Sequence, residues 1–141
     1  MRLLAVGDQD FYDCDIDDKM EAMLEPIHDV NQIVHVTTFY FPGICETAMA
    51  WAYDRGISHA SYDTSKTPYP MDITATSPLS FLRKIVGDYH INGFFFHFID
   101  NKQQNEDVDR VFRMRIRNMY KQVVKNYKKF PIYTNLEKPF N

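Results

Sequence analysis

Residues 33–56 read IVHVTTFYFPGICETAMAWAYDRG, and this stretch predicts a buried strand, a ligand-facing loop and the start of a helix. The β-branched run at 33–36 is typical of buried parallel strands. Residues 37–43 supply turn formers and three aromatic side chains, and residues 44–55 predict a helix that stops at Gly56. Strand, loop and helix in this order form the unit of α/β proteins, which bind ligands where the strand ends.

The length and composition favour a single domain. A length of 141 residues suits a single core, and 45% of the residues are apolar. The formal net charge of −3 gives no global reason to expect nucleic acid. Cys14 and Cys45 are too few for a disulfide framework and lack metal-ligand spacing, which favours reduced thiols and a cytoplasmic location. The opening residues MRLLAVGD are apolar over too few positions for a signal peptide or a membrane span, so no membrane partner is expected.

Strand and helix patterns alternate along the rest of the chain. Further strands are predicted at residues 3–6, 57–62, 91–99 and 130–134, and helices at 16–25, from 78 onward and at 106–127. The first helix is expected to end near Glu25, because Pro26 disfavours helical geometry in the residue before it. The alternation predicts a single three-layer Rossmann-like α/β domain, residues 1–141, with a parallel sheet of about five strands.

Two motifs resemble a known family. Residues 7–13, GDQDFYD, are similar to the opening turn of the SLOG superfamily (Smf/DprA and LOG Rossmann-like proteins), in its short YspA-like branch. In residues 43–57, Gly43, Trp51-Ala52 and Arg55-Gly56-Ile57 fall in the register of that branch's second helix. The resemblance covers roughly residues 1–60 and implies a Rossmann-like fold that binds nucleotides or nucleotide-derived ligands. Some members of the superfamily also cleave the N-glycosidic bond of nucleoside monophosphates.

The chain departs from this family at the phosphate-binding turns. Gln9 stands where the family has an arginine, and Cys45 stands where it has an aspartate. Gly43 is the one glycine left in its turn, and residues 99–103 replace a loop that carries a threonine and a glutamate in the catalytic branch. Bare backbone that could wrap a phosphate is lost at both turns. The expected function is therefore to sense or sequester a nucleotide or nucleotide-derived ligand, with weak catalysis or none.

The predicted ligand site lies at the carboxyl ends of the first, second and fourth strands. Its residues are Gly7, Asp8, Gln9, Asp10, Thr37, Thr38, Tyr40, Phe41, Gly43, Asp100 and Asn101. Tyr40 and Phe41 could stack on a base while amides from Gly43 onward hold an anion; alternatively, these aromatics only cover the sheet end. Glu46 is the candidate catalytic residue if the protein is a nucleotide N-glycosidase, and otherwise a plain first-turn acid that suits the helix dipole.

Clustered acids raise the question of a metal. Four aspartates lie close together in the sequence: Asp8, Asp10, Asp13 and Asp15. They could bind a hard cation, but their spacing lacks the glycine and glutamate of an EF-hand loop, so a solvated capping loop is favoured. No metal or other cofactor is expected. Acids at the ligand site would disfavour a polyphosphate unless a metal or an arginine intervenes.

Three other features each admit two interpretations. His35 and His97 lie in predicted buried strands, which favours satisfied core residues over catalytic ones. Cys45 at a helix start could have a lowered pKa, or it fills a small buried position. After the acids at its start, the last helix carries cations on its expected outer side: Arg110, Arg113, Arg117, Lys121, Lys125 and Lys128. These cations form a solvated face or dock a partner, so a protein-interaction module or a homo-oligomer is the alternative function.

Overall fold

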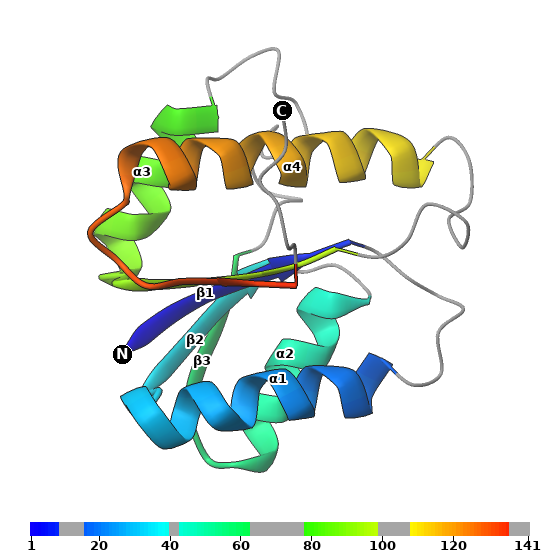
Figure 1. Cartoon of the computed structure of the whole chain (residues 1–141), viewed down its shortest axis with the longest axis vertical. Coiled ribbons are helices and arrows are strands. Elements are labelled where there is room, and N and C mark those ends of the chain that lie inside the picture. The colour runs from blue at the N-terminus through cyan, green and yellow to red at the C-terminus, as the bar shows by residue number, and fades with distance from the viewer. Residues whose placement is uncertain (9–15, 40–42, 63–77, 99–107, 136–141) are drawn as a thin grey trace.

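In the computed structural model, the described residues form five parallel strands and four helices (Figure 1). The strands are β1 (Arg2–Gly7), β2 (His35–Phe39), β3 (Ser58–Tyr62), β4 (Gly93–His97) and β5 (Ile132–Thr134). The helices are α1 (Ile16–Asn31), α2 (Ile44–Asp54), α3 (Pro78–Tyr89) and α4 (Val108–Asn126). The structure describes residues 1–8, 16–39, 43–62, 78–98 and 108–135, and of residues 16, 78 and 108–113 it describes the backbone only. The predicted α/β class and the five-stranded parallel sheet are confirmed.

The sheet has the strand order β3-β2-β1-β4-β5. The chain first builds outward from β1 through β2 to β3, then crosses back to β4 on the other side of β1. In Figure 1, α1 and α2 lie below the sheet, and α3 and α4 lie above it. Because every connection returns to a parallel strand, all strands end at one edge, and α1, α2 and α4 begin near that edge (Figure 1).

β1 and β4 form the buried centre of the sheet. Alternate residues of β1 point to opposite sides of the sheet. Leu3 and Ala5 belong to the core between the sheet and helices α1 and α2, and Leu4 and Val6 belong to the core between the sheet and helices α3 and α4. β4 continues this pattern with Phe95 on the first side and two more phenylalanines on the second. Burying a phenylalanine side chain stabilises the fold by about 1.5–3 kcal/mol, so the predicted hydrophobic stretch at 91–99 is a main source of stability.

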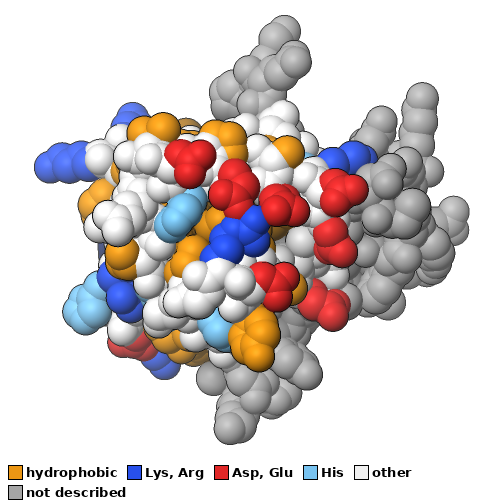
Figure 2. Space-filling view, turned by 90° about the horizontal axis from the view of Figure 1, so that it is seen from below, with side chains coloured by type: hydrophobic (Ala, Val, Ile, Leu, Met, Phe, Trp, Pro, Cys, Tyr) orange, Lys and Arg blue, Asp and Glu red, His pale blue; other side chains and the backbone are white. Residues whose placement is uncertain are grey.

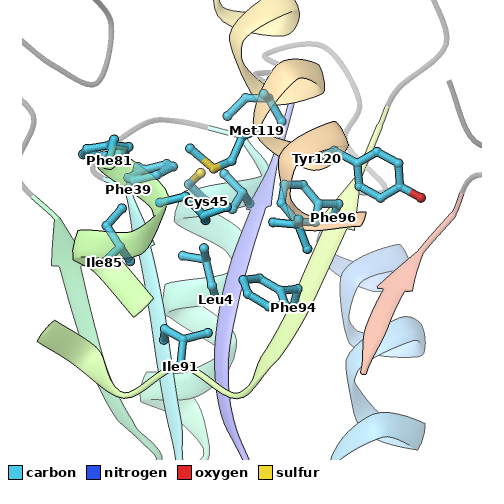
Figure 3. Close-up of a cluster of buried hydrophobic side chains, with 14 of the residues drawn as sticks. Leu4, Phe39, Cys45, Phe81, Ile85, Ile91, Phe94, Phe96, Met119 and Tyr120 are labelled. Atoms are coloured by element: carbon cyan, nitrogen blue, oxygen red, sulfur yellow. The ribbon is translucent and has the colours of Figure 1, made fainter. Parts of the chain in front are cut away.

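The core under α3 and α4 is the more aromatic of the two (Figure 3). Phe39, Phe94 and Phe96 rise from the sheet, and Phe81 and Tyr120 pack onto them from the two helices. The Phe96 and Tyr120 rings meet edge to face with their centroids 5.3 Å apart, a favoured geometry for aromatic pairs. This layer places α4 firmly over β4, which fixes the position of the side chains on the inner side of α4.

Two predicted boundaries are wrong. α1 does not end near Glu25 but continues through the exposed Pro26 to Asn31. The buried Ile27 holds the last turns of α1 on the core, and the carbonyl that Pro26 cannot bond lies on the exposed side of the helix. The second boundary is that of β2.

β2 runs over residues 35–39 and not over 33–36. Its ladder to β1 begins where Arg2 pairs with His35, and its ladder to β3 extends to Phe39, which pairs with Tyr62. Val34 is 51% exposed and lies before the strand. Residues 37–39, predicted as part of the ligand loop, are therefore inside the sheet. None of the helices that the structure describes combines the length and the apolar character that crossing a membrane requires.

Candidate functional site

β1 ends with a glycine that leaves no room for a side chain. A Cβ atom on Gly7 would lie 2.5 Å from the carbonyl oxygen of His97 and 2.5 Å from Cγ2 of Ile44. Gly7 pairs with His97 at the end of β4, and Ile44 is the first residue of α2. A glycine is therefore required where β1, β4 and α2 converge, for close approach of the backbones.

The start of α2 is fastened to the end of β1. The Asp8 amide donates to the His97 carbonyl (3.1 Å), and the Ile44 amide donates to the Asp8 carbonyl (3.4 Å). Gly43 precedes the helix with φ 83° and ψ −131°, a conformation that favours glycine. The Thr47 amide donates to the Gly43 carbonyl (3.0 Å), and the amides of Cys45 and Glu46 lie in the first turn that this bond closes. They are the donors that helix N-termini offer to anions.

Asp8 is paired with an arginine from the opposite layer. Its side chain is only 1% exposed, and its Oδ1 lies 3.2 Å from Nη1 of Arg117 on α4. The second guanidinium nitrogen of Arg117 donates to Oδ2 at 3.5 Å. The two hydrogen bonds give the fork geometry of arginine–carboxylate pairs. The acid expected to repel a ligand anion is thus neutralised by an arginine.

Arg117 is held in place by the end of β4. Its guanidinium carbon lies 5.0 Å from the ring centre of Phe98, within range of a cation–π contact. Asn135 fixes Phe98 in turn, since its side chain accepts from the Phe98 amide (2.8 Å) and donates to the Phe98 carbonyl (2.6 Å). The Arg117 side chain is 18% exposed, so it faces this edge of the sheet and not bulk solvent. The prediction that Arg117 lies on the outer side of its helix is wrong.

The predicted ligand residues divide into three groups. Gly7, Asp8 and Gly43 meet at the carboxyl ends of β1 and β4 and the start of α2. Thr37 and Thr38 are fully buried within β2, where the Thr37 hydroxyl lies 2.9 Å from Nε2 of His35. The remaining residues lie outside the described part of the chain: Gln9, Asp10, Tyr40, Phe41, Asp100 and Asn101.

The candidate catalytic acid stands in the first turn of α2. Glu46 is exposed there, one turn from Gly43, as the sequence predicts for an acid near a helix start. Its neighbour Thr47 donates a hydrogen bond to the Asp17 carboxylate of α1 (3.2 Å), which ties the two helix starts together. Within the described residues, no group of three or more histidine, cysteine or acidic side chains is placed to hold a metal ion.

Cys45 and the two strand histidines are core residues. Burial raises the pKa of the Cys45 thiol, against smaller opposing effects from the Thr38 hydroxyl and the backbone of Gly7 and Phe39. The buried interpretation of Cys45 is thereby confirmed, and that of a lowered pKa is wrong. His35 bonds Thr37 and, through Nδ1, the Ser58 hydroxyl (2.8 Å), and the His97 ring stacks on Phe95.

Sequence reasoning missed Arg117 as a site residue because the charge pattern of α4 makes it one cation among many. The helical register contains a signal: Ile116, Met119, Tyr120 and Val123 define the buried side, and Arg117 follows Ile116 directly at its border. Comparison of the chain with models of known protein families, with curated proteins and with solved structures finds no match.

Proposed function

We propose that this protein is a cytoplasmic binder of a nucleotide or nucleotide-derived small molecule, which it senses or sequesters. The ligand would lie at the carboxyl edge of the sheet, against Gly7 and Asp8 of the first strand and Gly43 of the α2 start. The resemblance of residues 7–13 and 43–57 to SLOG proteins supports the ligand class. The fold supports the position of the ligand at the carboxyl ends of the strands.

The observation that carries the proposal is the reversal of strand order at β1. The chain winds from β1 to β3 on one side and from β4 to β5 on the other, so the connections after β1 and β4 leave in opposite directions. In open parallel sheets, ligands bind outside the carboxyl ends of the strands at such a switch point. Here the switch point falls between Gly7 and His97, beside the start of α2.

The charges at this edge suit an anionic group on the ligand. Arg117 offsets the carboxylate of Asp8, which removes the repulsion that a lone buried acid would exert. The N-terminus of α2 contributes the partial positive charge of its dipole and the amides of Cys45 and Glu46. Arg117 on α4 thus takes the electrostatic place of the first-turn arginine that the SLOG family has at the position of Gln9.

Isothermal titration calorimetry against nucleosides, mononucleotides, cyclic nucleotides and ADP-ribose derivatives tests the proposal. We expect saturable binding of at least one phosphorylated member. We further expect Arg117→Lys, which keeps the charge but loses the two-pronged geometry, to weaken that binding about 10-fold or more. The matched control is Lys121→Gln, one turn further along α4 and exposed, which should bind as the wild type does. No heat from any ligand in the set would contradict the proposal.

A further inference from the structure

The two helical layers carry opposite charge. The described side chains of α1 and α2 include seven carboxylates and one lysine, Lys19; the carboxylates are Asp17, Asp18, Glu21, Glu25, Asp29, Glu46 and Asp54. The described side chains of α3 and α4 include six cations and one acid, Asp88; the cations are Arg83, Lys84, Arg115, Arg117, Lys121 and Lys125. The net charge of −3 does not reveal this separation, because the opposite charges of the two helical layers, on either side of the sheet, largely cancel in the sum.

Ion pairs within the molecule neutralise only some of these charges, so most of the charged side chains remain exposed at the surface. Arg55, which follows α2, ion-pairs with Glu21 (2.6 Å) and Glu25 and lies over the Trp51 ring. Figure 2 shows the face of α1 and α2, with acidic side chains spread around a small basic patch. On the opposite layer, Arg117 turns inward to Asp8. We define the acidic face as the exposed residues Asp17, Asp18, Asp29, Glu46 and Asp54, and the basic face as the exposed residues Arg83, Lys84, Lys121 and Lys125.

The charges fall in matching rows along two helices. Lys121 and Lys125 follow Met114 by seven and eleven residues, which places all three on one side of α4. Asp18, Glu25 and Asp29 have the same spacing on α1. The α4 row thus holds two lysines and a methionine, and the α1 row holds three carboxylates, of which Glu25 pairs with Arg55.

Each face also carries an exposed apolar side chain. Met114 on α4 is 56% exposed. On the acidic side, Val30 of α1 is 82% exposed and Tyr53 of α2 is 72% exposed. Methionine and tyrosine are enriched at protein interfaces, where they supply the contact area that charges alone do not.

We propose that a second copy of this chain docks its basic face on the acidic face of the first, head to tail. A two-fold dimer through either face would place like charges together, which opposes association. A head-to-tail contact joins two different faces, so it continues into a ring or an open filament. The contact uses the outer sides of the helical layers, and Glu46 is the one residue of the two faces that also borders the proposed ligand site.

Sedimentation velocity of the full chain over a range of concentration and salt tests the proposal. Exposed charges are screened as salt rises, since the Debye length falls from about 10 Å at 0.1 M to about 3 Å at 1 M. We expect species larger than a dimer to form at about 50 mM NaCl and to dissociate at least about 10-fold more readily at about 500 mM. A monomer at all concentrations in low salt would overturn the proposal, as would a dimer that never grows.

Charge reversal on one face at a time makes the test specific. The variants Lys121→Glu/Lys125→Glu and Asp29→Lys/Asp54→Lys should each fail to self-associate, because the first cancels the net charge of the basic face and the second cancels most of the charge of the acidic face. Mixed together, they should form complexes again, which also shows that each is folded. The control Lys128→Glu/Lys129→Glu makes the same charge change in the turn after α4 and should still associate.

Three results of the variant experiments would reject the head-to-tail contact. The first is equal loss of association in the control and the α4 variant, because net charge and not the face would then be responsible. The second is a mixture of the two opposite variants that stays monomeric while circular dichroism shows both folded. The third is a wild-type monomer whose basic face binds heparin or RNA, which would assign that face to a polyanion.

Discussion

Asp8 at the end of β1 forms an ion pair with Arg117 on α4, 109 residues further along the chain. The pair connects the two sides of the switch point, since Asp8 follows the central strand and Arg117 belongs to the helix that follows β4. It also decides the charge of the proposed site. The same two residues therefore join β1 to α4 and set the charge of the proposed ligand site.

A double-mutant cycle at Asp8 and Arg117 should show strong coupling. Arg117→Gln leaves the carboxylate of a 1%-exposed residue without its guanidinium, and breaking a buried pair in this way costs about 3–5 kcal/mol. Asp8→Asn should cost less, about 1–3 kcal/mol, because Arg117 retains some contact with water. The double variant should be more stable than the sum of the two losses by about 1–3 kcal/mol, measured by urea unfolding. Additive losses would mean that the pair contributes nothing.

Gly7 and Gly87 should respond in opposite directions to alanine. At Gly7 the added Cβ meets His97 and Ile44 at 2.5 Å, so we expect a loss of about 1–3 kcal/mol or more in the free energy of unfolding. At Gly87 in α3 nothing lies within 4 Å of the new atom, and a helical Gly→Ala change should stabilise by about 0.5–1 kcal/mol. Urea unfolding of both variants measures this; equal effects at the two positions would refute the close approach at the end of β1.

His35 should make the protein less stable in mild acid. Burial first, and then the charges of Arg2 and His59, lower the pKa of His35 below its ordinary value of 6.5. As the pH falls below that value the unfolded chain takes up the proton first, so the free energy of unfolding decreases with falling pH until the folded-state pKa is passed. His35→Gln should reduce this dependence by at most about 1.4 kcal/mol per pH unit, the limit for one proton.

The control for His35 is the exposed His90 after α3: the pH dependence of His35→Gln is compared with that of His90→Asn and of the wild type. Urea unfolding at several pH values between about 5 and 8 spans the ordinary titration range of histidine. A His35→Gln variant with the full wild-type slope would show that other groups cause the dependence.

Cys45 should resist thiol reagents in the folded protein. Its side chain is fully buried and burial raises its pKa, so little thiolate is present and no reagent can reach it without an opening of the fold. In a Cys14→Ser background, Ellman's reagent should label Cys45 only as fast as the chain opens, and immediately in denaturant. Rapid labelling of the native protein would instead indicate an accessible, reactive thiol.

The fold could be predicted because its signals are local. Residues 91–99 are apolar enough to require a strand buried on both sides, and Gly56 marks the end of α2 in sequence as in structure. Pro26 predicts the wrong helix end because packing overrides its local preference. The burial of Ile27 stabilises the last turns of α1 by more than the hydrogen bond lost at the proline destabilises them. β2 was misplaced because its ends are set by pairing with β1 and β3, which a single segment does not encode.

The site could be predicted only in part. Gly7, Asp8 and Gly43 follow from where strands end and helices begin. Arg117 could not be found in this way, since its role depends on α4 crossing over β4 and on a partner 109 residues away. The turn formers after residue 36 predict a loop at Thr37 and Thr38, but both residues lie inside β2.

Backbone amide NMR tests the central claim most directly, that a nucleotide-derived ligand binds at the carboxyl ends of β1 and β4. Titration with the tightest ligand from the calorimetric set should shift the amides of Gly7, Asp8, Glu46 and Phe98. The amides of Ile33 and Asn92, at the opposite edge of the sheet, should stay unchanged. Shifts that gather at Ile33 and Asn92, or saturation without any change at Gly7 and Asp8, would contradict the account.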